Sequence, residues 1–146
     1  MKQLLNASIL LMACASTLGE PRGSGRTIPC KTAQVASSCY RTHGRLSVAN
    51  GNPSYRLWKT GTRRLLGIYS GPEAFSRQAE SKYALDNEGP QLPSNVEEAL
   101  WRSVSGPWPN VIFADFEVCP LDKEESDSMQ AACIESEKNI VIKKND

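Results

Sequence analysis

Histidine is nearly absent from this chain of 146 residues, which contains only His43. A metal site built from several imidazoles is therefore excluded, and any catalytic system that needs an imidazole base would have to use this one residue. The sequence also lacks a glycine-rich phosphate loop, a dinucleotide-binding glycine motif and closely spaced cysteine pairs. We therefore expect no cofactor and no metal ion.

Acidic residues are absent between Pro21 and Pro72, where nine lysines and arginines occur. From Glu73 to Asp146 there are fifteen acids and seven bases, so the net charge of +1 conceals two halves of opposite sign. Either the halves pair with each other in the folded chain, or the basic half presents an anion-binding face. The candidates for such a face are Arg41, Arg45, Arg56, Trp58 and Arg64.

No apolar run in the chain is long enough to cross a bilayer as a helix. Residues 1–15 instead have the pattern of a signal peptide, with one lysine, a short apolar stretch and small residues from Ala13 onward. Leu11-Met-Ala-Cys14 also resembles a bacterial lipobox, in which Cys14 becomes the acylated N-terminus. Cleavage before Cys14 and cleavage after Ala15 both fit these residues.

The expected organisation follows from this leader. Residues 16–38 include a stretch rich in Pro, Gly and Ser and are expected to be a flexible spacer, and residues 39–144 a single small β domain. We expect an exported protein of the bacterial periplasm or cell envelope, held at the membrane by a lipid anchor where Cys14 is acylated.

Removal or acylation of Cys14 leaves four cysteines, and an even number in an exported chain predicts two disulfides. Cys119 ends one predicted strand and Cys133 lies in the next. We expect these two to be bridged, because neighbouring strands bring cysteines within bonding reach. Cys30 and Cys39 are the candidates for the second bridge, and a bridge between Cys39 and Cys133 stays open as an alternative.

The first part of the domain has the alternation of short β-strands. Apolar and polar residues alternate from Tyr40 to Val48, and Asn50-Gly-Asn-Pro53 supplies a turn. Two further strands are predicted at 54–59 and 63–69, separated by Gly61-Thr62.

A helix and further strands complete the predicted order. Ser94 and Glu97 have the spacing of a capping box, which predicts a helix from about Asn95 to Val104. Strands follow at 111–119, 129–135 and 139–143. We predict a mainly β fold with one helix, a small antiparallel barrel of OB-like type (β-β-β-α-β-β), with a β-sandwich or an α+β sheet as alternatives.

Two groups could carry catalysis on this domain. His43 lies on the polar face of the first strand, and Asp115 and Glu117 share one face of a later strand, where paired carboxylates could act on a glycoside. No nucleophile motif accompanies the histidine, and any solvated strand face needs polar residues. We therefore predict no catalytic residue.

Several short motifs resemble a family of small uncharacterised exported bacterial proteins. They are Thr42-His-Gly-Arg-Leu-Ser47, Asn50-Gly-Asn-Pro53, Leu57-Trp58 with Gly61-Thr62, Leu66-Gly-Ile68 and Asp115-Phe-Glu-Val-Cys-Pro120. The resemblance spans residues 40–140 and implies no activity. It implies that Cys119 and Cys133 belong to the shared domain, whereas Cys30 and Cys39 are additions near the spacer.

Together these features predict a binding or structural module. Its expected partner is an anionic glycan or an anionic protein surface, and no nucleic acid is expected outside the cytoplasm. The alternative is a small periplasmic hydrolase that uses His43 or the Asp115/Glu117 pair.

Overall fold

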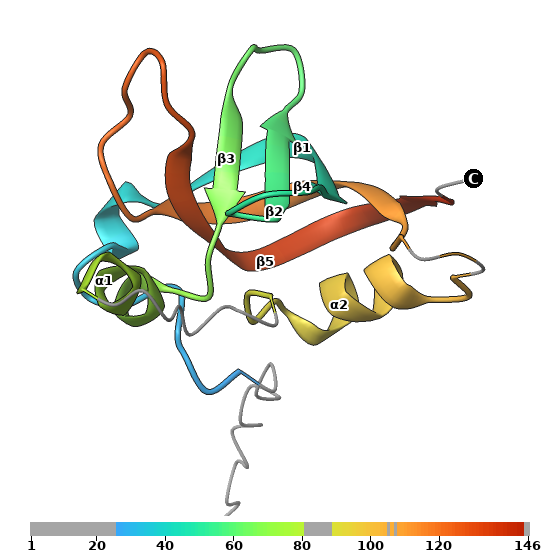
Figure 1. Cartoon of the computed structure of the whole chain (residues 1–146), viewed down its shortest axis with the longest axis horizontal. Helices are drawn as coiled ribbons and strands as arrows, with labels where there is room; N and C mark the ends of the chain where they lie inside the picture. Colours follow the sequence, from blue (N-terminus) through green and yellow to red (C-terminus); the bar gives the residue numbers. More distant parts are fainter. Residues whose placement is uncertain (1–25, 81–88, 105, 107, 145–146) are drawn as a thin grey trace, which may run out of the picture.

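Five strands close into a barrel in the order β1-β2-β3-β5-β4 (Figure 1). The computed structural model describes residues 26–80, 89–104, 106 and 108–144. The strands are β1 (Tyr40–Val48), β2 (Tyr55–Lys59), β3 (Leu65–Ile68), β4 (Val111–Pro120) and β5 (Gln130–Lys143). A short 3₁₀ helix, η1 (Ala36–Ser38), precedes them, and the helices α1 (Pro72–Glu80) and α2 (Ser94–Trp101) lie between β3 and β4.

This arrangement confirms the predicted mainly β fold and small OB-like barrel with a helical segment after the third strand, although this segment contains two helices where one was predicted. The pairing is mixed rather than wholly antiparallel, because β3 and β5 run parallel while the other pairs are antiparallel. After the helical connection β4 runs antiparallel to β1, and β5 returns antiparallel to β4, so β5 has the same direction as β3. The barrel is closed and leaves none of these five strands as an unpaired edge.

The last strand is continuous where the sequence predicted two strands and a turn. Lys138 pairs with Asp115 and Val141 pairs with Phe113, so one extra residue of β5 is accommodated between these pairs. Asn139 lies at this β-bulge with a φ of 57°. Asparagine tolerates this left-handed conformation better than most residues. The turn expected between the two predicted strands, at residues 136–138, is wrong, because these residues pair with Glu117, Phe116 and Asp115 on β4.

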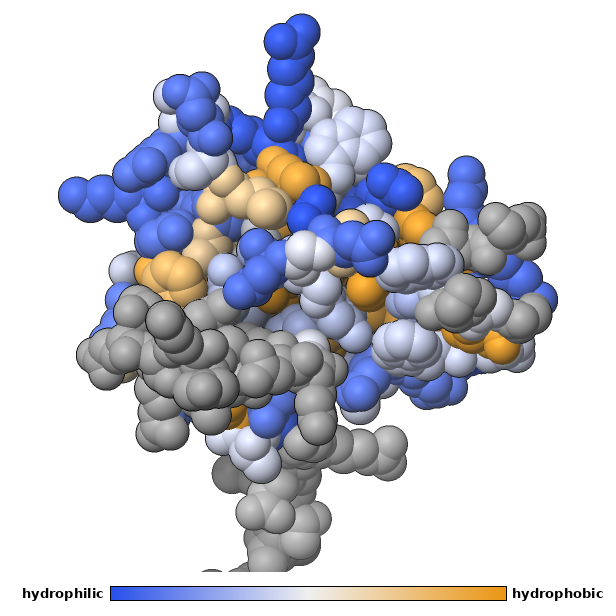
Figure 2. Space-filling view, in the orientation of Figure 1, coloured by the Kyte–Doolittle hydropathy of each residue, from blue (hydrophilic) through white to orange (hydrophobic). Residues whose placement is uncertain are grey.

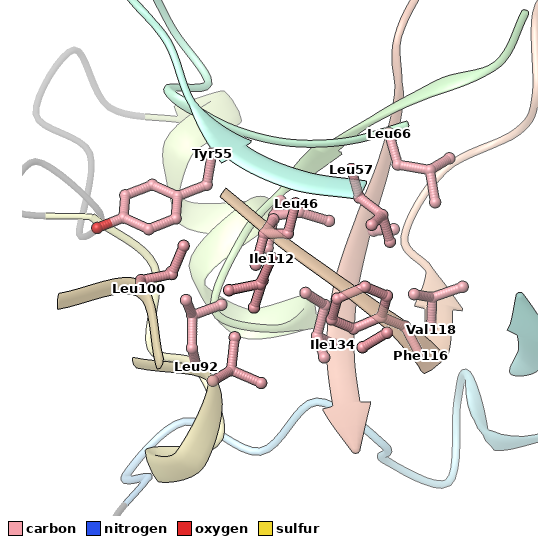
Figure 3. Packing of buried hydrophobic residues seen from close by; sticks show 14 of the residues in the cluster. Leu46, Tyr55, Leu57, Leu66, Leu92, Leu100, Ile112, Phe116, Val118 and Ile134 are labelled. Atoms are coloured by element: carbon pink, nitrogen blue, oxygen red, sulfur yellow. The ribbon is translucent and has the colours of Figure 1, made fainter. Parts of the chain in front are cut away.

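The barrel interior is filled by the inward residues of the alternating strands and by α2. Figure 3 shows Leu92 and Leu100 beside Ile112 at one end of the core, with Phe116 and Ile134 towards the other end. All five side chains are buried. The helix therefore closes one end of the barrel.

The helix α2 starts and ends differently from the sequence expectation. Pro93 occupies the N-cap position and no side chain caps the helix, so the predicted capping box does not form. The Asn95 side chain instead donates a hydrogen bond to Glu137 on β5. At the other end, Asn110 is buried and donates its side-chain amide to the carbonyls of Ala99 (3.0 Å) and Arg102 (2.8 Å). These bonds satisfy carbonyls that a helix end leaves free.

The two disulfides join Cys30 to Cys133 and Cys39 to Cys119. The predicted connectivity, Cys119 with Cys133 and Cys30 with Cys39, is therefore wrong, although all four cysteines are bridged. Cys119 does lie opposite Cys133 between β4 and β5. However, the pairing of Tyr40 with Val118 also places Cys39 beside Cys119 on its other side, with 4.1 Å between their Cα atoms.

The residues before β1 are held against the barrel. Cys30 is anchored to β5, and the Arg26 guanidinium donates to the backbone carbonyls of Ser70 and Ile134. The amide N–H groups of Thr27 and Ile28 both donate to the side chain of Gln91. We call residues 26–39 the N-terminal strap. Residues 26–38, which were expected to belong to a flexible spacer, thus pack on the barrel. The predicted signal peptide, including Cys14, and residues 16–25 of the predicted spacer lie outside the described residues.

Candidate functional site

The outer surface of β1 carries the polar residues of the basic half of the chain. Leu46 is buried inside the barrel, whereas Arg41 and His43 are exposed and Arg45 is half-buried. This alternation is the one predicted from sequence. It places the cationic side chains of β1 on the outside of the barrel.

Neighbouring strands extend this surface with aromatic and apolar residues. Arg45 lies opposite Trp58 on β2 and, on its other side, opposite Phe113 on β4. Trp58 in turn lies opposite Leu65 on β3. We call these four residues the cross-strand row, which runs across β3, β2, β1 and β4.

Trp58 is the tryptophan of this row and is 37% exposed. Its indole Nε1–H donates to the carbonyl of Thr62 at 2.7 Å, in the turn after β2. That bond fixes the ring and uses its only polar group. The exposed part of Trp58 is consequently an apolar ring surface beside Arg45.

The five predicted anion-binding residues lie on the outer surface but do not form one site. Arg41 faces Glu117 at 3.6 Å, and Arg64 forms an ion pair with Glu124 at 2.7 Å. Both charges are therefore partly compensated within the chain. This part of the charge asymmetry is intramolecular pairing, as one of the two interpretations expected.

Arg45 and Arg56 have no acidic partner among the residues that the structure describes. Arg56 donates to the backbone carbonyls of Pro53 (3.2 Å) and Asn50 (2.9 Å), which orient its guanidinium without neutralising it. Together with Trp58 these two arginines define the surface that we call the basic face. It unites three of the five predicted residues.

The candidate catalytic histidine does contact a carboxylate. His43 Nδ1 lies 2.9 Å from Asp115 Oδ1, and Asn139 Nδ2 donates to Asp115 Oδ2 at 2.7 Å. A hydrolase of this type also needs a hydroxyl or thiol bonded to the second imidazole nitrogen. Within residues 26–80, 89–104 and 108–144 no such nucleophile is bonded to His43.

The two candidate carboxylates share the outer face of β4, as predicted, but both are held in the ionised form. Hydrogen bonds from Asn139 and then from His43 lower the pKa of Asp115. Hydrogen bonds from Lys31 and then from Ser136 lower the pKa of Glu117. A glycoside hydrolase needs one carboxyl with a raised pKa as its general acid, and neither residue supplies it.

The cysteines form one compact buried cluster. The sulfur atoms of Cys30, Cys119 and Cys133 lie within 4.8 Å of one another. Because each of these residues belongs to a disulfide, none provides the thiolate that a zinc or iron site needs.

A pocket of about 490 Å³ lies next to the cross-strand row. It is bounded by Arg63 in the β2–β3 turn, by Leu65 at the start of β3, and by the β4–β5 loop, including Ser126 and Met129. Arg64 holds this loop through its ion pair with Glu124 and a bond to the Glu125 carbonyl at 3.0 Å. Leu65 belongs to both the pocket and the row.

Sequence reasoning missed Phe113, Leu65 and this pocket. Phe113 shares the outward register of Asp115 and Glu117, so the alternation of β4 contained the signal for its position. The pocket depends on the parallel pairing of β3 with β5, which brings the β4–β5 loop beside Arg63. No local pattern encodes that contact.

Comparisons with protein-family models, with curated proteins and with solved structures found no match to this chain. The resemblance to small exported bacterial proteins therefore stays a prediction. No helix in the described part of the chain combines the length and the apolar character needed to cross a membrane.

Proposed function

We propose that this chain is an exported binding module of the bacterial cell envelope and that its basic face binds an anionic partner. The observation that carries this proposal is the placement of Arg45 and Arg56 around Trp58 without an acidic partner among the described residues. An arginine that is not neutralised internally keeps its charge for a ligand. Its planar guanidinium suits carboxylate, sulfate or phosphate groups.

The proposed location rests on two further observations. The chain has two disulfides, and three of the four bridged cysteines are buried. Disulfides of this kind favour a protein that folds in an oxidising compartment. The signal-peptide pattern and the lipobox-like Cys14 precede the described residues. Acylation of Cys14 would tether the domain through the chain that leads to Arg26.

The loops and the start of the described chain lie at different ends of the domain. In Figure 1 the described chain begins on the side of α1 and α2, whereas the β2–β3 turn and the β4–β5 loop project from the opposite end.

Charge reversal at the basic face tests the binding role. The double variant Arg45→Glu/Arg56→Glu should lose salt-sensitive retention on an anionic matrix, because the free cations are replaced by anions. Lys138→Glu/Lys144→Glu is the matched control, since it changes the net charge equally through exposed lysines outside the face. Equal retention of the Arg45→Glu/Arg56→Glu variant and the unmodified chain would refute the proposed function.

The hydrolase alternative is favoured by one observation, the contact between His43 and Asp115. Its weakness is that the described residues bring no nucleophile to the histidine and that the pKa values of Asp115 and Glu117 are lowered. The binding module is therefore the better supported function.

A further inference from the structure

The exposed ring of Trp58 offers a ligand one apolar surface of fixed orientation. Its Nε1–H is already bonded to Thr62, so a ligand cannot use it as a donor without breaking that bond. A partner that matches Trp58 must therefore carry C–H groups or a ring face. A simple inorganic anion would leave this surface unused.

Trp58 has a cationic neighbour on one side and an apolar neighbour on the other. Arg45 lies directly beside it on β1, Leu65 directly beside it on β3, and Phe113 lies beyond Arg45 on β4. Neighbouring strands are about 4.8 Å apart. This separation is close to the length of one pyranose unit, so a chain of sugars lying across the strands would place successive rings over successive strands.

The cross-strand row ends beside a pocket that could bind the next sugar units of such a chain. Leu65 borders the pocket that also contains Arg63, and Arg63 has no ion pair among the described residues. The β2–β3 turn and the β4–β5 loop that enclose it project from the same end of the molecule (Figure 1). In Figure 2, drawn in the same orientation, hydrophilic residues dominate this end.

Two other polymers fit these features less well. An extended acidic peptide usually binds by adding a strand to an open sheet edge, and this barrel is closed. A single-stranded nucleic acid usually stacks successive bases on several aromatic rings, whereas the basic face displays one exposed ring. A sugar polymer needs only an occasional aromatic ring on the protein, with polar side chains between the rings to bind its hydroxyl and acid groups.

We infer that the anionic partner is an acidic polysaccharide: a carboxylate-bearing sugar ring stacks on Trp58, its acid groups pair with Arg45 and Arg56, and the chain continues over Leu65 towards the pocket. This inference rests on the proposed binding function and adds the class of ligand.

Trp58→Ala separates ring stacking from charge attraction. The full chain is tested against immobilised polygalacturonate and against sulfonate beads, which carry negative charge but no sugar ring. Trp58→Ala should bind polygalacturonate at least tenfold more weakly and should elute from sulfonate at the same salt concentration as the unmodified chain. Trp58→Phe should restore part of the affinity, which a merely misfolded variant would not.

Trp108→Ala is the matched control. Trp108 is 44% exposed on the connection between α2 and β4 and is not part of the row. This variant should match the unmodified chain on both matrices. Arg45→Glu/Arg56→Glu should lose retention on both.

The outcomes distinguish failure of the polysaccharide inference from failure of the proposed anion-binding function. Suppose that Trp58→Ala binds polygalacturonate as well as the unmodified chain does, while Arg45→Glu/Arg56→Glu is not retained on either matrix. The inference of a polysaccharide ligand is then wrong, and the proposed anion-binding function stands. If Arg45→Glu/Arg56→Glu is retained normally on both, the proposed function itself fails. If the unmodified chain binds polyglutamate or oligothymidylate as tightly as polygalacturonate, or more tightly, the inference of a polysaccharide ligand is also wrong.

Discussion

Arg45 on β1 and Trp58 on β2 are directly opposite each other on the outside of the barrel. Residue 45 and residue 58 belong to a segment in which many arginines and aromatic residues are interleaved, but most of the others are paired or buried. Tyr55, for example, is buried in the core, and Arg41 faces Glu117. Within this basic and aromatic stretch, the register of β1 and β2 therefore places an exposed ring beside an arginine that has no acidic partner among the described residues.

The disulfide connectivity predicts the products of digestion without reduction. Peptide mapping should recover Cys30 linked to Cys133 and Cys39 linked to Cys119. Replacing Cys39 and Cys119 together by serine should lower the free energy of unfolding by about 4 kcal/mol, because the bridge closes a long loop of the unfolded chain. Recovery of a peptide linking Cys119 to Cys133 would contradict the structure.

Close packing of the N-terminal strap predicts a strong effect at Gly71. A Cβ atom at this position would lie 2.3 Å from the carbonyl oxygen of Pro29, and backbone atoms cannot move aside cheaply. Gly71→Ala should therefore lower the free energy of unfolding by about 1–3 kcal/mol. Gly106→Ala is the control, because a Cβ there meets no atom of the described residues within 4 Å. Equal stability of the two variants in chemical denaturation would show that the strap is not packed as described.

The lowered pKa of Glu117 predicts that the free energy of unfolding decreases in acid. Its pKa is lowered from the ordinary 4.5 by hydrogen bonds from Lys31 and Ser136. The folded state favours the charged form, so the stabilisation is complete above pH 4.5 and disappears as the pH falls through the lowered pKa. Glu117→Gln should cost about 1 kcal/mol at pH 7. This difference from the unmodified chain should close in acid, and a difference independent of pH would exclude ionisation as its cause.

Glu137 predicts the opposite dependence on pH. Burial raises its pKa above 4.5 despite the hydrogen bond from Asn95, and its buried Oε2 atom has no hydrogen-bond partner among the residues that the structure describes. The folded state here favours the neutral form, so this group lowers stability as the pH rises from 4.5 through the raised pKa. Glu137→Gln should stabilise the chain at pH 7 by up to about 1 kcal/mol, and the gain should shrink below pH 4.5. A destabilised Glu137→Gln variant at pH 7 would contradict this assignment.

The sequence predicted the barrel because its signals are local. Alternation in β1 and β4 and the turn residues after β1 depend on neighbours along the chain, and each is found where it was expected. The polar residues 136–138 predicted a turn, but they pair with β4, and the bulge at Asn139 lies in the segment predicted as the final strand.

The disulfide partners and the site depend on contacts between distant residues. Cys119 has a cysteine on each side, Cys39 on β1 and Cys133 on β5, so strand adjacency alone could not select the bridge. In the same way, nothing local distinguishes Arg45, which has no acidic partner in the described part of the chain, from Arg41, which faces Glu117. The register of β2, β1 and β4 makes that distinction, because it sets which side chains lie beside each arginine.

Amide and indole resonances provide the most direct test of the anion-binding surface. The chain has three tryptophans, and each contributes one indole N–H signal in a nitrogen–proton correlation spectrum. Titration with polygalacturonate should shift the Trp58 indole signal and the backbone amides of Arg45 and Arg56, while the Trp101 and Trp108 indole signals stay in place. Shifts confined to Trp101 and Trp108, or an unchanged spectrum at saturating polymer, would contradict the account.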